Sequence, residues 1–286
     1  MKNIIWLILF FSLKNAPLIH AQALFSDFGA ESGGMGQTQA AGQQAENIFG
    51  NVASLGFANN MQVVSGIKSQ FGGMFNSVGF GVNLPTQIGN AAFSVMRFGD
   101  KIYSEQQISA AFAIKNEGVK IGFRSNLLQI NALGIGSKFI PNFDVGVITQ
   151  LSKNLWLGAY ANNITQAGFQ TQDFIQKLPS AISLGIRTLP VQNLTLQADL
   201  VKEVEHSVSF RAGCQYLLTP QLAVRTGIDS STGSMHWGSS FTLKKMMVHY
   251  AMSNIPRLGN THQVTLVFHF KSAKKKSDIL TADEGK

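Results

Sequence analysis

The sequence predicts a transmembrane antiparallel β-barrel of about fourteen strands, and three observations lead to this class. Apolar and polar side chains alternate with a period of two over most of residues 61–270, as in a strand with two different faces. Charged residues make up 13% of the chain, about half their usual share in soluble proteins. After residue 23 the chain has no run of about 18 apolar residues, so a membrane would have to be crossed by strands.

Residues 1–23 predict a signal peptide, and we therefore expect an exported protein. Lys2 provides the positive n-region, and residues 4–13 form an apolar run that is too short to span a bilayer. Small residues at Ala21 and Ala23 suit cleavage after Ala23, or alternatively after Ala21. The competing interpretation of the apolar run is a buried N-terminal helix.

Residues 24–60 lack the strand pattern and are expected to form a plug, or hatch, inside the barrel. The segment is rich in Gly, Ala and Gln, which predicts short helical turns joined by loops. Its apolar side chains could line a pocket for a hydrophobic molecule, or they could pack the plug against the wall. These side chains are Phe25, Phe28, Phe49, Leu55 and Phe57.

The barrel itself is predicted over residues 61–270, as strand-length segments separated by short turns. Segments of about eight to eleven residues suit strands that cross a membrane at a tilt. The predicted strands are 61–71, 74–84, 89–98, 104–114, 117–126, 141–151, 154–163, 179–188, 193–203, 206–217, 221–229, 235–244, 246–254 and 262–270.

The polar face of these segments indicates a water-accessible lumen rather than the outside of a soluble β-sandwich. It consists mainly of Ser, Gly, Thr, Asn and Gln, whereas a sandwich exposes many Lys and Glu. Single charges on this face are expected to form ladders across the lumen, which either stabilise a filled interior or tune ion selectivity. The candidate lumen charges are Lys120, Arg124, Asp144, Arg187, Asp199, Arg211, Arg225 and Asp229.

The C-terminal end carries an outer-membrane feature followed by a tail. The last predicted strand ends on Phe270, and a closing strand with a final aromatic residue resembles the terminal signature of outer-membrane barrels. Residues 271–286 contain five Lys against three acidic residues. We expect them to form a basic, disordered periplasmic tail.

Residues 34–36 read Gly-Met-Gly, and residues 51–55 read Asn-Val-Ala-Ser-Leu. These motifs resemble the PorV/PorQ group of FadL-like outer-membrane barrels, which reads Gly-Met-Gly and then Asn-Pro-Ala-Gly-Leu near its N-terminus; this chain departs from the group at Val52 and Ser54. The runs 151–158 and 258–266 resemble the group's polar turn and closing hairpin. The resemblance implies a fourteen-strand barrel in the bacterial outer membrane with a hatch motif at Gly34, Met35, Gly36, Asn51, Ala53 and Leu55.

The same resemblance implies two functions. The first is an accessory, non-enzymatic role in type IX protein secretion or in attaching cargo to the cell surface. Its partners would be outer-membrane lipid, secretion-system components or a secreted cargo protein, with the connections 133–142 and 164–177 as candidate cargo surfaces. The alternative is a FadL-like transporter that carries a hydrophobic small molecule through the lumen. A continuous apolar pocket beside the hatch would favour the transporter.

Other classes of function find little support in the sequence. Cys214 is the only cysteine, which excludes an intramolecular disulfide, and the His residues lack paired ligand spacing, so neither a metal site nor a cofactor is expected. An enzyme is not expected either, because the alternation brings no Ser close to a His base; Ser239 after His236 is a chance match. The net charge of +8 is too diffuse to indicate nucleic acid.

Overall fold

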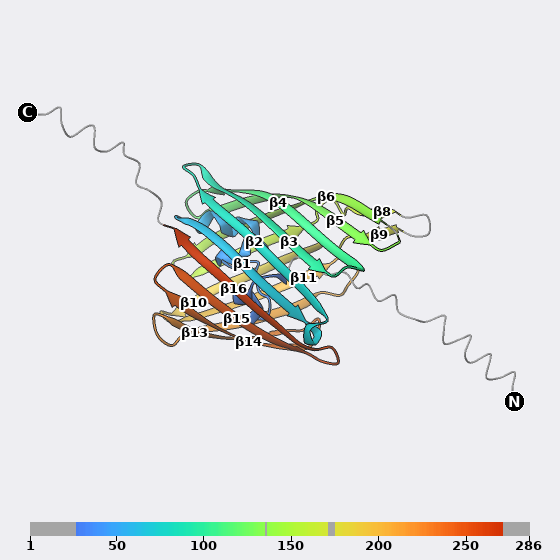
Figure 1. Cartoon of the computed structure of the whole chain (residues 1–286). Helices are drawn as coiled ribbons and strands as arrows, with labels where there is room; N and C mark the ends of the chain where they lie inside the picture. The colour runs from blue at the N-terminus through green and yellow to red at the C-terminus, as the bar shows by residue number, and fades with distance from the viewer. Residues whose placement is uncertain (1–26, 135, 171–174, 271–286) are drawn as a thin grey trace, which may run out of the picture.

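The computed structural model describes residues 27–134, 136–170 and 175–270, and its strands close into a fourteen-stranded antiparallel barrel (Figure 1). The predicted fold class is confirmed. The predicted signal peptide, the first three hatch residues and the C-terminal tail lie outside the described residues. The strands of the wall, in order around the barrel, are β1 (Met61–Gln70), β2 (Phe75–Pro85), β3 (Gly89–Gly99), β4 (Tyr103–Lys115), β5 (Val119–Ala132), β6 (Gly136–Ser152), β7 (Leu155–Asn162), β10 (Ala181–Val191), β11 (Leu194–Glu203), β12 (Ser209–Leu217), β13 (Leu222–Asp229), β14 (Ser234–Leu243), β15 (Met246–Ile255) and β16 (Gly259–Phe270).

Closure of the sheet gives every wall strand two hydrogen-bonded neighbours, and the outer face is largely apolar. β1 pairs with β16 from Met61↔Phe270 to Ser69↔His262, which leaves no open edge at the ends of the sheet. Exposed apolar side chains alternate with buried ones on most wall strands, for example around Phe80 on β2 and Leu157 on β7. In the described part of the chain, no helix combines the length and the apolar character needed to cross a bilayer.

The largest difference from the predicted elements lies at 133–142. This stretch is mostly strand, because β5 and β6 pair as far as Ala132↔Gly136, so the predicted long connection and cargo surface at 133–142 is wrong there. The other long connection, 164–177, contains a small two-stranded sheet of β8 (Gly168–Gln170) and β9 (Ile175–Lys177), beyond the end of the barrel in Figure 1.

The lengths of the connections give the barrel its orientation. At the end where β1 begins and β16 finishes, the turns have at most four residues, whereas the long connection with β8 and β9 is at the opposite end. Outer-membrane barrels have short periplasmic turns and longer extracellular loops. We therefore refer to the first as the periplasmic end and to the second as the outer end.

Residues 27–60, called the inner segment from here on, lie inside the wall (Figure 1). The segment contains the short helix α2 (Ala30–Gly34) and the 3-10 turns η3 (Ala45–Ile48) and η4 (Val52–Phe57). Helix α2 packs against β13 to β16, and η4 packs against β3 to β6. The inner segment thus reaches from one side of the barrel to the other.

Candidate functional site

The inner segment approaches the wall most closely where the wall residue is glycine. A Cβ atom added to Gly79 would lie 2.7 Å from the ring of Phe28, and one added to Gly81 would lie 2.7 Å from Ile48. Such distances are too short for real side chains, so the backbone of the wall itself forms the contact surface. The glycines that meet the inner segment in this way are Gly79, Gly81, Gly122, Gly146, Gly158, Gly185, Gly213, Gly227 and Gly238.

The first part of the predicted hatch motif lies against β12 to β14. Gly34 is so close to Gly238 that an added Cβ would lie 2.9 Å from its Cα. Met35 is buried against Gly213. Gly36 has a φ of +68°, and a side chain there would meet backbone oxygens of β12 and β13. Gly34 and Gly36 therefore have no room for a side chain where the segment lies against the wall, and Met35 fills the space beside Gly213.

The second part of the motif connects turn η4 to the rest of the segment and to the wall. Asn51 is fully buried; its Nδ2 donates to the Ala40 carbonyl at 2.5 Å, and its Oδ1 accepts from the Ala53 amide at 3.0 Å. The Leu55 carbonyl accepts hydrogen bonds from Asn90 at 2.5 Å and from Asn83 at 3.3 Å. Asn51, Ala53 and Leu55 thus hold one turn in place.

Two of the predicted lumen charges form a buried ion pair that grips the inner segment. Arg124 Nη2 lies 2.7 Å from Asp144, and each side chain is 4% exposed. Arg124 also donates to the Ile48 carbonyl at 2.8 Å and to the Tyr160 hydroxyl at 3.0 Å. Both members of the pair belong to the wall. The hydrogen bond from Arg124 to the Ile48 carbonyl therefore anchors η3 to the wall.

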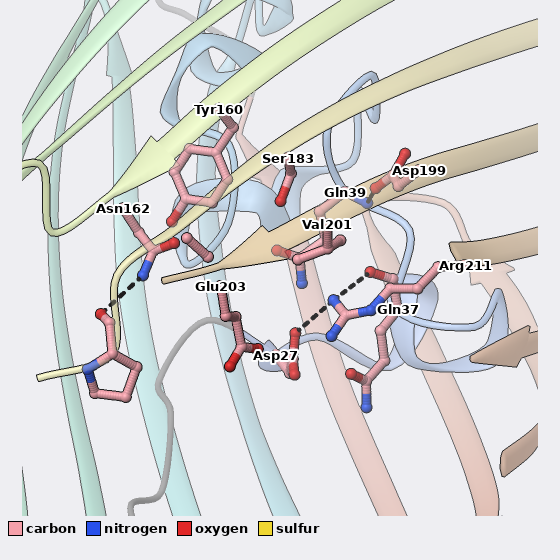
Figure 2. A pocket seen from close by; sticks show the side chains of 12 residues that line it. Asp27, Gln37, Gln39, Tyr160, Asn162, Ser183, Asp199, Val201, Glu203 and Arg211 are labelled. Atoms are coloured by element: carbon pink, nitrogen blue, oxygen red, sulfur yellow. Dashed lines mark hydrogen bonds and ion pairs between the residues drawn. The ribbon is translucent and has the colours of Figure 1, made fainter. Parts of the chain in front are cut away.

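A second set of charges lies at the outer end, where a small polar pocket opens (Figure 2). Asp199 accepts from the amides of Gln39 at 2.6 Å and Ala40 at 2.9 Å, and Arg211 lies 3.1 Å from both Asp27 and Asp229. The space that the centre of a water molecule can occupy in this pocket is about 20 Å³. A cavity needs roughly 10–15 Å³ of such space to hold one water. The pocket has room for water but not for a larger molecule.

The remaining predicted charges lie nearer the periplasmic end and are not matched by carboxylates of the wall. Arg225 donates to Gln215 at 2.7 Å and to Ser240 at 3.2 Å, and it lies 3.5 Å from Glu31 of the inner segment. The Arg187 guanidinium lies 5.7 Å from the centre of the Trp156 ring. Lys120 donates to the carbonyl of Asn116. The charges therefore contact the inner segment more than they form ladders across an open lumen.

An apolar cluster lies on the opposite side of the lumen. Phe28, Ile48, Phe49, Val52 and Leu55 of the inner segment form one buried cluster with wall side chains of β1, β3, β4 and β16: Val64, Ala92, Met96, Ala113 and Val267. Phe25 lies outside the described residues, and Phe57 lies beside Lys120. The inner segment's side chains pack against the wall instead of lining an empty pocket.

Glu46 is a buried acid in the inner segment that the sequence analysis did not single out as a site residue. Its Oε2 accepts the amide of Glu31 at 2.6 Å, and its Oε1 has no partner among the described residues. Burial, with the nearby Glu31 carboxylate, raises the pKa of Glu46 to about 8. Glu46 is therefore neutral in the folded protein at pH 7.

The structure also brings together a Ser and a His that the sequence analysis did not pair. Ser234 Oγ lies 2.7 Å from His236 Nε2, and His236 Nδ1 lies 2.8 Å from the Gly33 carbonyl. A carbonyl only accepts, so Nδ1 carries the proton and Nε2 accepts from Ser234. The available sequence signal was the spacing of two positions, which places Ser234 and His236 on the same face of a strand. Ser239 lies on the other face. Both side chains are at most 3% exposed, so the pair anchors α2 to β14.

Comparison with solved structures identifies similar barrels. The crystal structure of the Pseudomonas putida toluene transporter TodX matches with a TM-score of 0.61 and 12% identity, over 85% of this chain and 97% of TodX. A TodX deltaS2S3 mutant, described as a monoaromatic hydrocarbon channel, gives 0.60 and 11%, over 85% and 99%. Acinetobacter baumannii outer membrane protein Omp33 gives 0.50 and 6%, over 74% and 98%. At these identities the likeness establishes the fold alone.

The protein has the fold of bacterial outer-membrane β-barrels. Its fold is that of the FadL-like TodX barrels, so the coarser part of the predicted resemblance is confirmed, and membership of the PorV/PorQ group stays a prediction. No protein-family model and no curated protein matches the chain. In the ranges that the structure describes, no group of three or more His, Cys, Asp or Glu side chains is placed to hold a metal ion.

Proposed function

We propose that this outer-membrane barrel transports a hydrophobic small molecule and that the inner segment is its hatch. The observation that carries the proposal is a closed barrel whose own N-terminal segment fills the lumen, in a fold shared with a toluene transporter. The polar pocket at the outer end is too small for a substrate. Passage therefore requires the inner segment to shift.

The apolar side of the lumen is the proposed route. Contacts of Phe28, Phe49 and their wall neighbours are van der Waals contacts without directional hydrogen bonds. A hydrophobic molecule can replace such contacts at little cost, whereas it would leave the buried donors and acceptors of the opposite side unpaired. We therefore place the path along β1 to β4.

The fold neighbours favour transport over the predicted accessory role in type IX secretion. That role, with cargo bound at 164–177, stays a prediction from sequence resemblance. Recovery of secretion components or cargo with the detergent-solubilised protein from its own outer membrane would support it over transport. Recovery of the barrel with a bound apolar molecule would support transport.

A reversible crosslink between the inner segment and the wall tests the transport proposal. A Cβ on Gly33 would lie 3.4 Å from Ala251 Cβ, close to the spacing of a disulfide. In a Cys214→Ser background, the Gly33→Cys/Ala251→Cys variant should admit labelled toluene into proteoliposomes when reduced and lose that uptake when oxidised. Equal uptake in both states would overturn the hatch role. Uptake by the wild-type protein no faster than by protein-free vesicles would overturn transport.

A further inference from the structure

Two basic side chains of the wall face a single carboxylate of the inner segment, that of Glu31 in α2. Arg225 Nη2 lies 3.5 Å from Glu31 Oε1, and His249 Nδ1 lies 3.7 Å from Glu31 Oε2. Glu31 also acts electrostatically on Arg187 at longer range. One carboxylate therefore balances two guanidinium groups, which leaves this part of the lumen with an excess of positive charge and of hydrogen-bond donors.

Several nitrogen atoms of this region have no acceptor among the described residues. They are Arg187 Nε, Arg225 Nη1, Trp156 Nε1 and both ring nitrogens of His249. Arg225 is 5% exposed and His249 is 1% exposed. Buried polar groups in folded proteins are nearly always paired, so these unpaired nitrogens, on β7 and β10 and on β13 and β15, indicate a ligand that supplies acceptors.

The wall holds these side chains in fixed positions. Arg187 and Trp156 are direct partners in the β7–β10 ladder, and the guanidinium lies over the indole ring. Gln215 and Ser240 hold Arg225 from the two neighbouring strands, and Ser240 is in turn the ladder partner of His249. The cluster follows the wall from β7 to β15 on the periplasmic half of the barrel.

We propose that Arg187, Arg225, His249 and Trp156, called the basic cluster below, bind an oxyanion: the carboxylate or phosphate group of a small molecule. A guanidinium group presents its N–H donors in a planar fork that matches both kinds of group. Glu31 faces the same donors in the unliganded protein and competes with the ligand for them. The indole ring provides a flat apolar surface for the ligand's adjoining part. The site requires no transport and stands apart from the apolar route.

Trp156 serves as a reporter for this site. The mature chain, after the predicted cleavage, contains Trp156 and Trp237, and Trp237 is exposed on the lipid-facing side of β14. In a Trp237→Phe background, the detergent-solubilised protein is titrated with benzoate and with inorganic phosphate at constant ionic strength. Toluene serves as the neutral counterpart of benzoate. We expect a saturable change in Trp156 emission with at least one of the two anions and a weaker or no change with toluene.

Variants assign the binding to the cluster. Arg225→Gln should weaken the apparent affinity at least tenfold, and Glu31→Gln should strengthen it severalfold because a competing carboxylate is removed. Arg97→Gln removes the same charge at an exposed position on the outside of β3 and should change nothing. If Arg225→Gln does not fold, Arg187→Gln replaces it. Saturation with benzoate alone assigns a carboxylate ligand, and saturation with phosphate alone assigns a phosphate.

Some outcomes would overturn the site. These are the absence of saturable binding with either anion, or an equal loss of affinity in Arg97→Gln and Arg225→Gln, which would indicate general screening. Toluene uptake measured in vesicles with the Arg187→Gln variant separates this result from the transport proposal. Loss of anion binding with unchanged toluene uptake would leave transport intact.

Discussion

The two sides of the lumen hold the same inner segment by different means. Along β1 to β4 and the end of β16, most contacts of the segment belong to the apolar cluster of Phe28, Ile48 and Phe49, and Asn83 and Asn90 donate to the Leu55 carbonyl. Along β5 to β15, directional contacts predominate: Arg124 donates to the Ile48 carbonyl, and Asp199 accepts from the Gln39 amide. The apolar cluster can exchange its contacts for a hydrophobic ligand, whereas the directional contacts fix the position of the segment.

The largest expected loss of stability comes from removing one partner of the buried Arg124–Asp144 ion pair on the polar side. Asp144→Ala leaves Arg124 charged and unpaired in the wall, and removal of one partner of a buried pair costs about 3–5 kcal/mol. Denaturant unfolding in phospholipid vesicles should show this loss of unfolding free energy. Glu205→Ala, at an exposed position in the turn after β11, is the matched removal of a carboxylate and should cost less than about 1 kcal/mol. Equal losses would contradict the anchoring role of the pair.

The next effect depends on pH and acts through Glu46. The pKa of Glu46 is about 8 in the folded protein, against an ordinary value of 4.5, so the folded state binds more protons than the unfolded state between these pH values. The contribution of Glu46 to the free energy of unfolding is therefore fully present below pH 4.5 and is lost as the pH rises towards 8. The loss is about 2–3 kcal/mol between pH 6 and pH 8. Unfolding at both pH values should show this fall in the wild-type protein and little of it in Glu46→Gln. The same slope in both proteins would assign the pH dependence to other groups.

Adding one methyl group to a glycine on each side sharpens the comparison. On the apolar side, Gly79→Ala meets the Phe28 ring, a side chain that can move by a rotamer adjustment. On the polar side, the methyl group added by Gly213→Ala would lie 2.7 Å from the carbonyl carbon of Met35. That atom belongs to the backbone and cannot move without its neighbours in the chain. We expect Gly213→Ala to cost about 1–3 kcal/mol and Gly79→Ala less. Limited proteolysis of the inner segment should follow the same order, and the reverse order would contradict the distinction.

The smallest effect tests how replaceable the apolar contacts are. Ile48→Val removes one buried methyl group beside Gly81 and should cost about 0.5–1.5 kcal/mol in unfolding free energy. Toluene uptake should be unchanged or faster, because the contacts that the substrate displaces are weaker. A clear fall in uptake with unchanged stability would place the transport route elsewhere.

Much of the fold was predictable from local sequence. Alternation identified both faces of the strands, because a side-chain period of two is a property of each strand by itself. The predicted strand ends agree with the structure within a few residues, except at 133–142, where a short Gly-containing turn lets β5 and β6 continue past the predicted connection. Arg124, Asp199 and Arg225, which stand on the polar stripe of their strands, are buried in the structure.

The sequence by itself determined a membrane barrel with an apolar outer face, because composition and alternation act residue by residue. Only the tertiary structure decided which groups meet. Arg211 contacts Asp27 across 184 positions of sequence, and His236 reaches Gly33 across 203. Such contacts depend on the ladder register and on the path of the inner segment through the lumen. Both are set by the closing of the whole sheet around that segment, and no local pattern contains them.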